Sequence, residues 1–252
     1  MRALIGHTGF VGSNLKAAGH YDAFFNTSNS SDMRGQSFTE VVCAGVSAVK
    51  WKANKDPNSD WAGIENLIDN LRQINTQRFV LISTIDVYKD PISVTEADEP
   101  IEEGGAYGVH RKRLECFVAK TFSNHLIIRL PALYGPGLKK NAIYDLQHDN
   151  MVEAIDPRGS FQWYDVSRLE SDMRRISEAG LSLINVAAEP VMMSEIADLY
   201  FPGKLRPADE TKPAASYDMR TKYATVLGGE GSYHFSHKRV IDGIGNYLKR
   251  NL

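Results

Sequence analysis

Three glycines near the start of the chain constrain its fold more than any other feature. Gly6, Gly9 and Gly12 lie in the run LIGHTGFVG, between an apolar segment, RALI, and a segment with helical spacing, FVGSNLKAA. In such a turn the first glycine permits a tight bend, the second lets backbone approach a pyrophosphate, and the third lets the helix pack closely on the strand. The helix N-terminus offers N–H groups to the anion. The motif predicts a dinucleotide-binding loop, with a plain strand–turn–helix corner as the alternative.

Apolar, strand-like runs alternate with helix-like runs over the first half of the chain. Strands are expected at RALIG, YDAFFNT, TEVVCAGVSA, RFVLIST and HLIIRLPALYG, and helices at FVGSNLKAAG, WAGIENLIDNLRQI and AYGVHRKRLECFVAKTF. Strands that are apolar on both faces are typical of a parallel sheet covered by helices on both sides. The sequence therefore predicts an α/β fold with a doubly wound, Rossmann-like parallel sheet.

The pattern changes after Gly137. Residues 138–252 mix aromatic and charged residues, with a strand expected at LSLINVA and two helices capped by Ser194 and Ser236. We interpret residues 1–137 as a dinucleotide-binding domain, to whose sheet later segments return. Residues 138–252 are expected to form a small C-terminal α/β lobe that binds the substrate.

The composition argues against several classes of function. With a formal net charge of -2, the chain has no excess of positive charge that would attract nucleic acid or an anionic membrane. Cys43 and Cys116 stand in apolar runs without a second cysteine or histidine nearby, so we expect reduced thiols and no metal site. The first ten residues run directly into the glycine motif, which leaves no room for a signal peptide. We therefore expect a cytoplasmic protein without nucleic-acid or membrane partners.

The candidate catalytic residues are Thr84, Tyr107 and Arg111. Ser83 and Thr84 end a predicted strand, and Tyr107 opens the helix that follows, so both sites are expected at the carboxyl ends of the strands, beside the nucleotide crevice. Arg111 lies one helical turn after Tyr107 and shares its face, whereas Lys112 turns about 100° away.

Five motifs in order along the chain resemble those of a known family. They are GHTGFVG, STIDVYKDP followed by TEADEP, AYGVHRKRLE, IIRLPALYGPG and NVAAEPVMMSEIADL. Together they resemble the extended short-chain dehydrogenase/reductases, and within them the NAD-dependent epimerase/dehydratase group that acts on nucleotide sugars.

The resemblance implies a role for each catalytic candidate. Tyr107 would exchange a proton with the substrate hydroxyl, Thr84 would hold the same oxygen, and the residue four after the tyrosine would bind the nicotinamide ribose and lower the tyrosine pKa. That residue is lysine in the family and Arg111 here. Arginine carries a permanent charge but has a longer, planar head with five donors, so it does not replace lysine unchanged. Two alternatives follow: an enzyme with altered geometry, or a catalytically silent NAD(P)-binding sensor or scaffold.

The expected reaction is hydride transfer at a sugar or nucleotide-sugar hydroxyl or ketone, giving epimerisation or reduction. Dehydration is the least expected outcome, because Ile85 follows Thr84 where a dehydratase usually carries an acidic residue. By analogy with the family, a homodimer is expected.

The sequence leaves NAD and NADP as alternative cofactors. The second strand ends in Asn26 and Ser28 without the acidic residue that reads a ribose 2′-hydroxyl, while Arg34 could meet a 2′-phosphate. The residues expected to contact the cofactor are Gly6, Thr8, Gly9, Phe10, Val11, Gly12, Asn26, Ser28, Ala44, Gly45, Ser83, Tyr107, Arg111, Pro131 and Leu133. Those expected near the substrate are Asn141, Gln162, Trp163 and Arg168, although Trp163 is equally suited to the core of the lobe.

Overall fold

The chain divides into two compact units. The computed structural model describes residues 1–100 and 103–250. Unit 1 comprises residues 1–89, 96–130 and 169–185, and unit 2 comprises residues 90–95, 131–168 and 186–252. The sequence predicts a single boundary after Gly137. In the structure, each unit is instead built from three separate segments of the chain.

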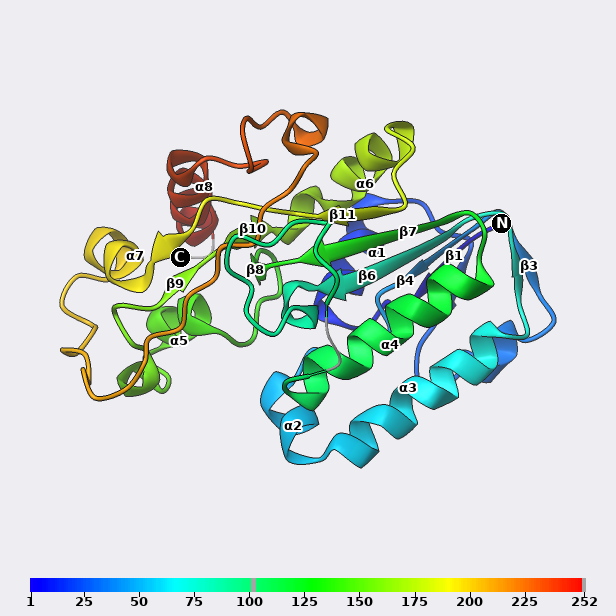
Figure 1. Ribbon diagram of the computed structural model, residues 1–252, viewed down its shortest axis with the longest axis horizontal. Coiled ribbons are helices and arrows are strands. Elements are labelled where there is room, and N and C mark those ends of the chain that lie inside the picture. Colours follow the sequence, from blue (N-terminus) through cyan, green and yellow to red (C-terminus); the bar gives the residue numbers. More distant parts are fainter. Residues whose placement is uncertain (101–102, 251–252) are drawn as a thin grey trace. The chain divides into compact units, whose positions relative to one another are not determined.

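Unit 1 is built on a six-stranded sheet (Figure 1). Its strands are β1 (Arg2–Ile5), β2 (Ala23–Phe25), β4 (Glu40–Cys43), β6 (Phe79–Thr84), β7 (His125–Leu130) and β11 (Leu183–Asn185). They follow the order β11-β7-β6-β4-β1-β2, and every neighbouring pair is parallel. The predicted doubly wound sheet is confirmed. The run LSLINVA, however, was expected in the small lobe and instead supplies the edge strand β11.

Helices cover both faces of this sheet. α1 (Phe10–Ala18) contacts α6 (Leu169–Glu178) on one face, and α3 (Pro57–Leu71) contacts α4 (Ala106–Thr121) on the other (Figure 1). The short α2 (Lys50–Lys55) was not expected from the sequence. α3 begins several residues before its predicted start, because the Asp56 side chain accepts a hydrogen bond from the Ser59 N–H and Pro57 occupies the first helical position.

The apolar core of unit 1 lies between the sheet and the helices α3 and α4. The rings of Phe79, on β6, and Phe122, at the end of α4, stack with centroids 4.3 Å apart. The cluster of buried side chains in this core also includes Ala3, Ile5, Phe25, Met33, Phe38, Val41, Cys43, Ile64, Leu67, Ile68, Leu71, Ile74, Leu81, Leu114, Val118 and Ile127.

Among its described residues, unit 2 contains two small strand pairs and three α-helices. β8 (Ala132–Tyr134) pairs with β10 (Trp163–Asp165) in parallel, and β9 (Ser160–Phe161) pairs with β12 (Val191–Met192) antiparallel. The helices are α5 (Ala142–His148), α7 (Met193–Tyr200) and α8 (His237–Arg250). The single strand expected over HLIIRLPALYG is divided at Pro131, which has no N–H to donate to a ladder.

The two predicted caps in unit 2 have different outcomes. Ser194 lies inside the first turn of α7, and the residue before that helix is Met192, so the predicted Ser194 cap is wrong. Ser236 directly precedes α8, and its Oγ accepts a hydrogen bond of 3.4 Å from the Arg239 N–H.

A buried polar network joins the strands of unit 1 to α4. Glu115 and Arg129 are each only 2% exposed and form a bidentate pair, with Nη2 2.6 Å from Oε2 and Nε 3.0 Å from Oε1. Glu115 also accepts a 2.5 Å hydrogen bond from the Ser83 hydroxyl, and Arg129 donates to the Tyr88 hydroxyl at 2.6 Å. The Asn185 amide donates to the same hydroxyl at 3.1 Å, so the network spans β6, α4, β7 and β11.

Breaking this pair on one side is expected to destabilise the fold strongly. Glu115→Gln leaves the Arg129 charge buried without a carboxylate, which costs about 3–5 kcal/mol. Chemical denaturation measures the change in unfolding free energy. The control is Arg72→Ala, which removes the exposed ion pair with Asp69 and should change stability by less than about 1 kcal/mol. Equal losses in both variants would contradict the assigned importance of the buried pair.

Candidate active site and dinucleotide pocket

The strand order of unit 1 places a crevice at the carboxyl ends of β1 and β4. From β1 the chain passes to β2 on one side, and β4 lies on the other, so the direction of winding reverses between them. Ile5 is in register with Phe25 and with Cys43, so the three strands end together. Ligands of open α/β sheets bind at such a switch point. A cleft of about 390 Å³ opens here, lined only by residues of unit 1.

Two glycines of the loop are required by its geometry. Gly6 has φ +84°, and a side chain there would overlap the backbone of Ala44 at the end of β4. A side chain at Gly12 would overlap the carbonyl group of Gly6. The first glycine therefore makes the turn and the third lets α1 begin against the loop, which are the roles that the motif predicts.

The cleft includes some of the residues predicted to contact the cofactor. Gly6, Thr8, Gly9, Asn26, Ala44 and Gly45 line it. Phe10, Val11 and Gly12 begin α1, and Ser28 donates through its N–H and hydroxyl to Asn26 Oδ1. Ser83 donates its hydroxyl to Glu115 and so belongs to the buried network, not to the cleft. Pro131 and Leu133 lie in unit 2.

The end of the cleft at β2 is lined by uncharged groups. Asn26, Thr27 and Ser30 supply amide and hydroxyl groups there. Arg34, the candidate for a 2′-phosphate, donates its Nε–H to Asn70 Oδ1 at 2.7 Å and is not among the residues that line the cleft. Among the described residues that line the cleft at the end of β2, none has a carboxylate that could accept a hydrogen bond from a ribose 2′-hydroxyl.

Tyr107 and Thr84 lie near one another in unit 1. Tyr107 is 8% exposed in the first turn of α4, and its phenol is close to the side chain of Thr84, the last residue of β6. Burial raises the pKa of Tyr107 above its ordinary value, although the positive charges of Arg111 and Lys50 and the nearby Thr84 hydroxyl oppose this shift. The phenol is therefore protonated at neutral pH and able to give a proton.

Gly108 determines how closely α4 approaches the end of β6. A side chain at this position would overlap the carbonyl oxygen of Asp86, in the 3-10 turn η2 (Ile85–Val87) that follows Thr84. The start of α4 is fixed from the other side by Asn54 of α2, whose Oδ1 accepts a 2.9 Å hydrogen bond from the Tyr107 N–H. The Tyr107–Thr84 contact thus depends on a glycine and on a cap supplied by a distant helix.

Most donors of Arg111 are engaged within unit 1. Its guanidinium pairs with both carboxylate oxygens of Asp60, with Nη1 2.6 Å from Oδ2 and Nη2 2.9 Å from Oδ1. It also donates to the backbone carbonyls of Ser47 at 2.6 Å and Tyr107 at 3.1 Å. Its carbon Cζ lies 3.9 Å from the centre of the Tyr107 ring. Four of its five N–H groups are thus held by the protein, and the charge lies against the ring of the candidate acid.

The carboxylate of Asp60 explains how an arginine fits at this position. Asp60 projects from α3 and also contacts His110 Nδ1 at 2.8 Å. Burial acts to raise the pKa of Asp60, but the hydrogen bonds from Arg111 and His110 outweigh it and leave the pKa below the ordinary value. The planar guanidinium forms a fork that matches both oxygens, which a lysine ammonium could not do.

A second cation lies near Tyr107. The ammonium of Lys50, the first residue of α2, is 2.6 Å from Asp86 Oδ1, and its charge acts on Tyr107. The sequence did not point to Lys50, Asn54 or Asp60 as site residues. They lie on helices about 50 residues before Tyr107, and no local spacing signals contacts over that distance.

The four predicted substrate residues lie in unit 2 and have different surroundings. Asn141 caps α5 by accepting from the N–H groups of Ile143 and Tyr144. Gln162 is 1% exposed, and its amide bonds to the backbone of Ala188 and Met219, which makes it a core residue. Trp163 and Arg168 line a separate cavity of unit 2.

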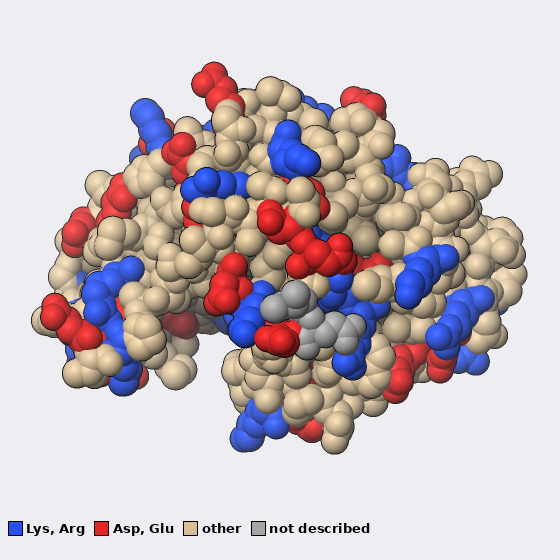
Figure 2. All heavy atoms as spheres, in the orientation of Figure 1, with Lys and Arg blue, Asp and Glu red and all other residues tan. Residues whose placement is uncertain are grey.

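Two negative observations concern the described part of the chain. None of its helices has both the length and the apolar character that crossing a membrane requires. Within the same residues, no three His, Cys, Asp or Glu side chains are grouped to hold a metal ion. On the face drawn in Figure 2, basic and acidic side chains are interspersed.

Substitution of Gly108 is expected to disrupt the candidate site. Gly108→Ala forces α4 away from the Asp86 carbonyl, so we expect a lower melting temperature. The matched control is Gly63→Ala, also in a helix, where the added methyl group meets no atom within 4 Å. That change should raise stability by about 0.5–1 kcal/mol, because alanine favours a helix over glycine. Thermal unfolding of the two variants tests this, and a stabilised Gly108→Ala protein would contradict it.

Replacing Arg111 by lysine is expected to weaken the fold at neutral pH. Arg111→Lys cannot make both bonds to Asp60, and the loss should be about 1.5–3 kcal/mol. Because the pKa of Asp60 is lower in the folded chain than the unfolded value of about 3.9, its contribution is present above that pH and is lost on further acidification.

Denaturation curves between pH 3 and 7 measure this difference. Wild type should lose stability below about pH 4, and Arg111→Lys should lose less over the same range. Lys112→Ala, which removes an amine paired with the exposed Glu99, is the control and should follow the wild type. A parallel pH dependence in wild type and Arg111→Lys would argue against the Asp60 pair.

Solved structures with the same fold cover the whole chain. UDP-glucose 4-epimerase of Thermotoga maritima is 14% identical, with a TM-score of 0.71 over 100% of this chain and 99% of that one. A dTDP-4-dehydrorhamnose reductase of Clostridium acetobutylicum is 16% identical, with a TM-score of 0.76 over 100% and 99%. RMD of Pseudomonas aeruginosa, solved with NADPH, is 20% identical, with a TM-score of 0.69 over 100% and 99%.

The sequence itself matches a family model over part of its length. No curated protein matches significantly. Residues 31–155, which include Thr84, Tyr107 and Arg111, match the model described as the NAD dependent epimerase/dehydratase family. This match assigns residues 31–155 of the chain to the NAD dependent epimerase/dehydratase family.

Proposed function

We propose that the chain is an NAD(P)-dependent oxidoreductase that transfers hydride at the carbonyl or hydroxyl carbon of a sugar, preferably a nucleotide-linked one, with Tyr107 as the acid and base. The observation that carries the proposal is the proximity of the Tyr107 phenol to Thr84 at the edge of the sheet that also holds the glycine loop. The family and the fold support the same class of reaction. Solved relatives in that fold include a UDP-glucose 4-epimerase and dTDP-4-dehydrorhamnose reductases.

The cleft of unit 1 would hold the dinucleotide, which supplies or accepts the hydride. The backbone of the glycine loop and the first N–H groups of α1 would bind the pyrophosphate, because a helix N-terminus favours an anion. Gly6, Gly9 and Thr8 line that part of the cleft. The neutral groups of Asn26 and Ser30 would face the adenosine ribose, and neither attracts nor repels a 2′-phosphate by charge.

Tyr107 and Thr84 would hold the substrate oxygen between their hydroxyl groups. As hydride reaches the carbonyl carbon, the oxygen gains negative charge, and the protonated Tyr107 gives it a proton. Because its pKa is raised, Tyr107 is protonated at neutral pH and can supply this proton when the substrate is reduced. In the reverse direction Tyr107 must take a proton, and the charges of Arg111 and Lys50 lower the energy of the phenolate.

Arg111 would act on Tyr107 through its position and charge. The family's lysine is implied to hold the nicotinamide ribose, but four N–H groups of Arg111 are already bound to Asp60, Ser47 and Tyr107. We therefore assign Arg111 to the support of Tyr107 rather than to ribose binding.

A catalytically silent NAD(P)-binding protein is the second candidate. The observation that favours it is the same engagement of Arg111, which removes most of its donors from a ligand. The two candidates share the dinucleotide cleft and differ in turnover, so one variant distinguishes them.

Tyr107→Phe is expected to abolish turnover while cofactor binding persists. Removing the proton donor should lower kcat by about 10²–10⁴-fold, with the affinity for NADPH or NADH within about threefold of wild type. Turnover is followed by nicotinamide absorbance with nucleoside-diphosphate sugars and their keto derivatives, including dTDP-4-dehydrorhamnose. Cofactor affinity is followed by fluorescence.

The control is Tyr223→Phe, which removes a phenol in unit 2 and should leave kcat unchanged. A wild-type protein that binds the dinucleotide but turns over none of these sugars would support the silent alternative. A Tyr107→Phe protein with full activity would refute the assigned role of Tyr107.

A further inference from the structure

Asp60 is a charged residue of the dinucleotide cleft to which the proposed function gives no contact with the cofactor. It lies in the first turn of α3 and is among the residues that line the cleft. Its side chain is buried to all but 8% of its surface. The ion pair with Arg111 explains why a carboxylate is tolerated there, but it does not explain why that carboxylate lies in the wall of the cleft.

The contacts of Arg111 place Asp60 at the end of the cleft near Tyr107. The guanidinium that Asp60 binds has its Cζ 3.9 Å from the centre of the Tyr107 ring. The same guanidinium donates to the backbone carbonyl of Ser47, which also lines the cleft. Asn26 lines the other end, after β2, and both β4 and β1 lie between β2 and β6. A dinucleotide with its adenosine at β2 therefore has its second ribose at the end where Asp60 lies.

The carboxylate of Asp60 has room for one more hydrogen bond. An ionised carboxylate has about four lone-pair sites on its two oxygens. Oδ2 is 2.6 Å from Arg111 Nη1 and 2.8 Å from His110 Nδ1, and Oδ1 accepts from Arg111 Nη2 at 2.9 Å. Within the described part of the chain these are the contacts of the two oxygens, so one lone pair of Oδ1 is left for a donor in the cleft.

A ribose hydroxyl is a donor that suits this oxygen. Burial acts to raise the pKa of Asp60, but the hydrogen bonds from Arg111 and His110 hold the pKa below its ordinary value, so the carboxylate is ionised at neutral pH. A hydrogen bond to an ionised acceptor is roughly twice as strong as one between neutral groups. Acidic residues hold the adenosine ribose in other Rossmann folds by the same chemistry. Because Arg111 and His110 fix the carboxylate in advance, binding a hydroxyl there requires little further ordering.

We propose that Asp60 is a cofactor-binding residue that accepts a hydrogen bond from a hydroxyl group of the nicotinamide ribose. The inference rests on the dinucleotide binding that is part of the proposed function. The family resemblance assigns ribose binding and the support of the tyrosine to a single lysine. In this chain two residues divide those tasks: Arg111 supports Tyr107, and its partner Asp60 holds the ribose. This ribose is the same in NAD and NADP, so the contact serves either cofactor.

Calorimetric titration of the whole chain with ADP-ribose and with ADP tests the contact, because only ADP-ribose carries the second ribose. Wild type should bind ADP-ribose more tightly than ADP. Asp60→Asn should lower the ratio of the two affinities about tenfold, because it removes an ionised acceptor, and should leave the affinity for ADP unchanged. The control is Asp56→Asn, which removes a carboxylate from the same cleft and keeps a residue able to cap α3. It should leave the ratio as in wild type.

A second pair of variants separates ribose binding from folding. Asp60→Asn leaves the Arg111 guanidinium buried without its carboxylate, which weakens the fold. Arg111→Met removes the guanidinium and keeps the carboxylate, so this variant should still prefer ADP-ribose to ADP. Adding Asp60→Asn to Arg111→Met should abolish that preference. Loss of the preference in Arg111→Met alone would assign the ribose to Arg111 and overturn the proposal.

The ribose contact and the proposed reaction fail under different results. A chain that turns over no sugar, but whose preference for ADP-ribose depends on Asp60, keeps the ribose contact and contradicts the proposed reaction. A chain that turns over sugars, with a ratio of affinities that Asp60→Asn does not change, contradicts the ribose contact alone. An equal fall of the ratio in Asp56→Asn, or a wild-type chain that binds neither probe, would also overturn the contact.

Discussion

The buried pair of Glu115 and Arg129 is the interaction on which the geometry of unit 1 depends. Two charges that are 2% exposed are tolerable only when each satisfies the other, so β7 and α4 must meet in one register. Ser83, bonded to Glu115, is the residue before Thr84, and Glu115 lies two helical turns after Tyr107. The network therefore holds both elements that carry the candidate catalytic hydroxyl groups.

A second ion pair adapts the helix of Tyr107 to an arginine. Arg111 would leave a large planar charge against the sheet if it had no partner, and Asp60 supplies both oxygens of a matching fork from α3. The pair ties α3 to α4 and keeps the guanidinium stacked on the Tyr107 ring. The residue that departs from the family motif is thus accommodated by Asp60, which lies outside the motifs quoted from the sequence. This accommodation is the physical ground for treating Arg111 as a supporting residue.

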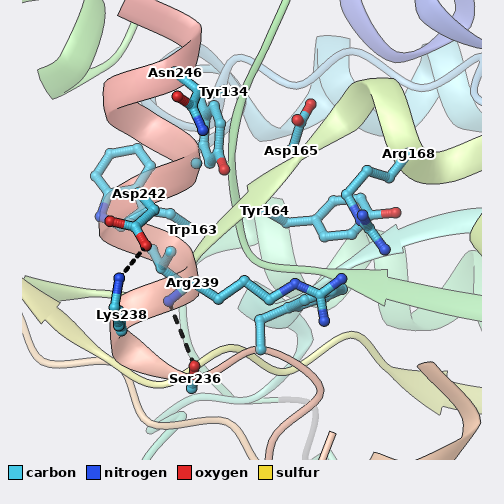
Figure 3. A pocket seen from close by; sticks show the side chains of 13 residues that line it. Tyr134, Trp163, Tyr164, Asp165, Arg168, Ser236, Lys238, Arg239, Asp242 and Asn246 are labelled. Atoms are coloured by element: carbon cyan, nitrogen blue, oxygen red, sulfur yellow. Dashed lines mark hydrogen bonds and ion pairs between the residues drawn. The ribbon is translucent and has the colours of Figure 1, made fainter. Parts of the chain in front are cut away.

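The chain also distributes polar groups differently in its two units. In unit 1 the polar side chains near the cleft are mostly committed to one another or to backbone, as in the cases of Arg111, Asp60 and Asn54. In unit 2 the cavity between β10 and α8 combines two arginines with a buried indole N–H that has no acceptor among the described residues (Figure 3). Committed groups fix a geometry in advance.

The sequence by itself determined the parallel α/β fold, the position of the glycine loop and the meeting of Thr84 with Tyr107. These features follow from local signals: apolar runs that alternate with helical spacing, glycines at a turn, and positions at the ends of elements. The sequence did not reveal α2, the place of β11 in the main sheet, or the partners of Arg111. Tertiary structure alone decided that Asn54 caps α4, that Asp60 holds Arg111 and that Ser83 belongs to a buried network. The physical reason is that these bonds join side chains more than 30 residues apart, and only packing of the helices and strands brings them within hydrogen-bonding distance.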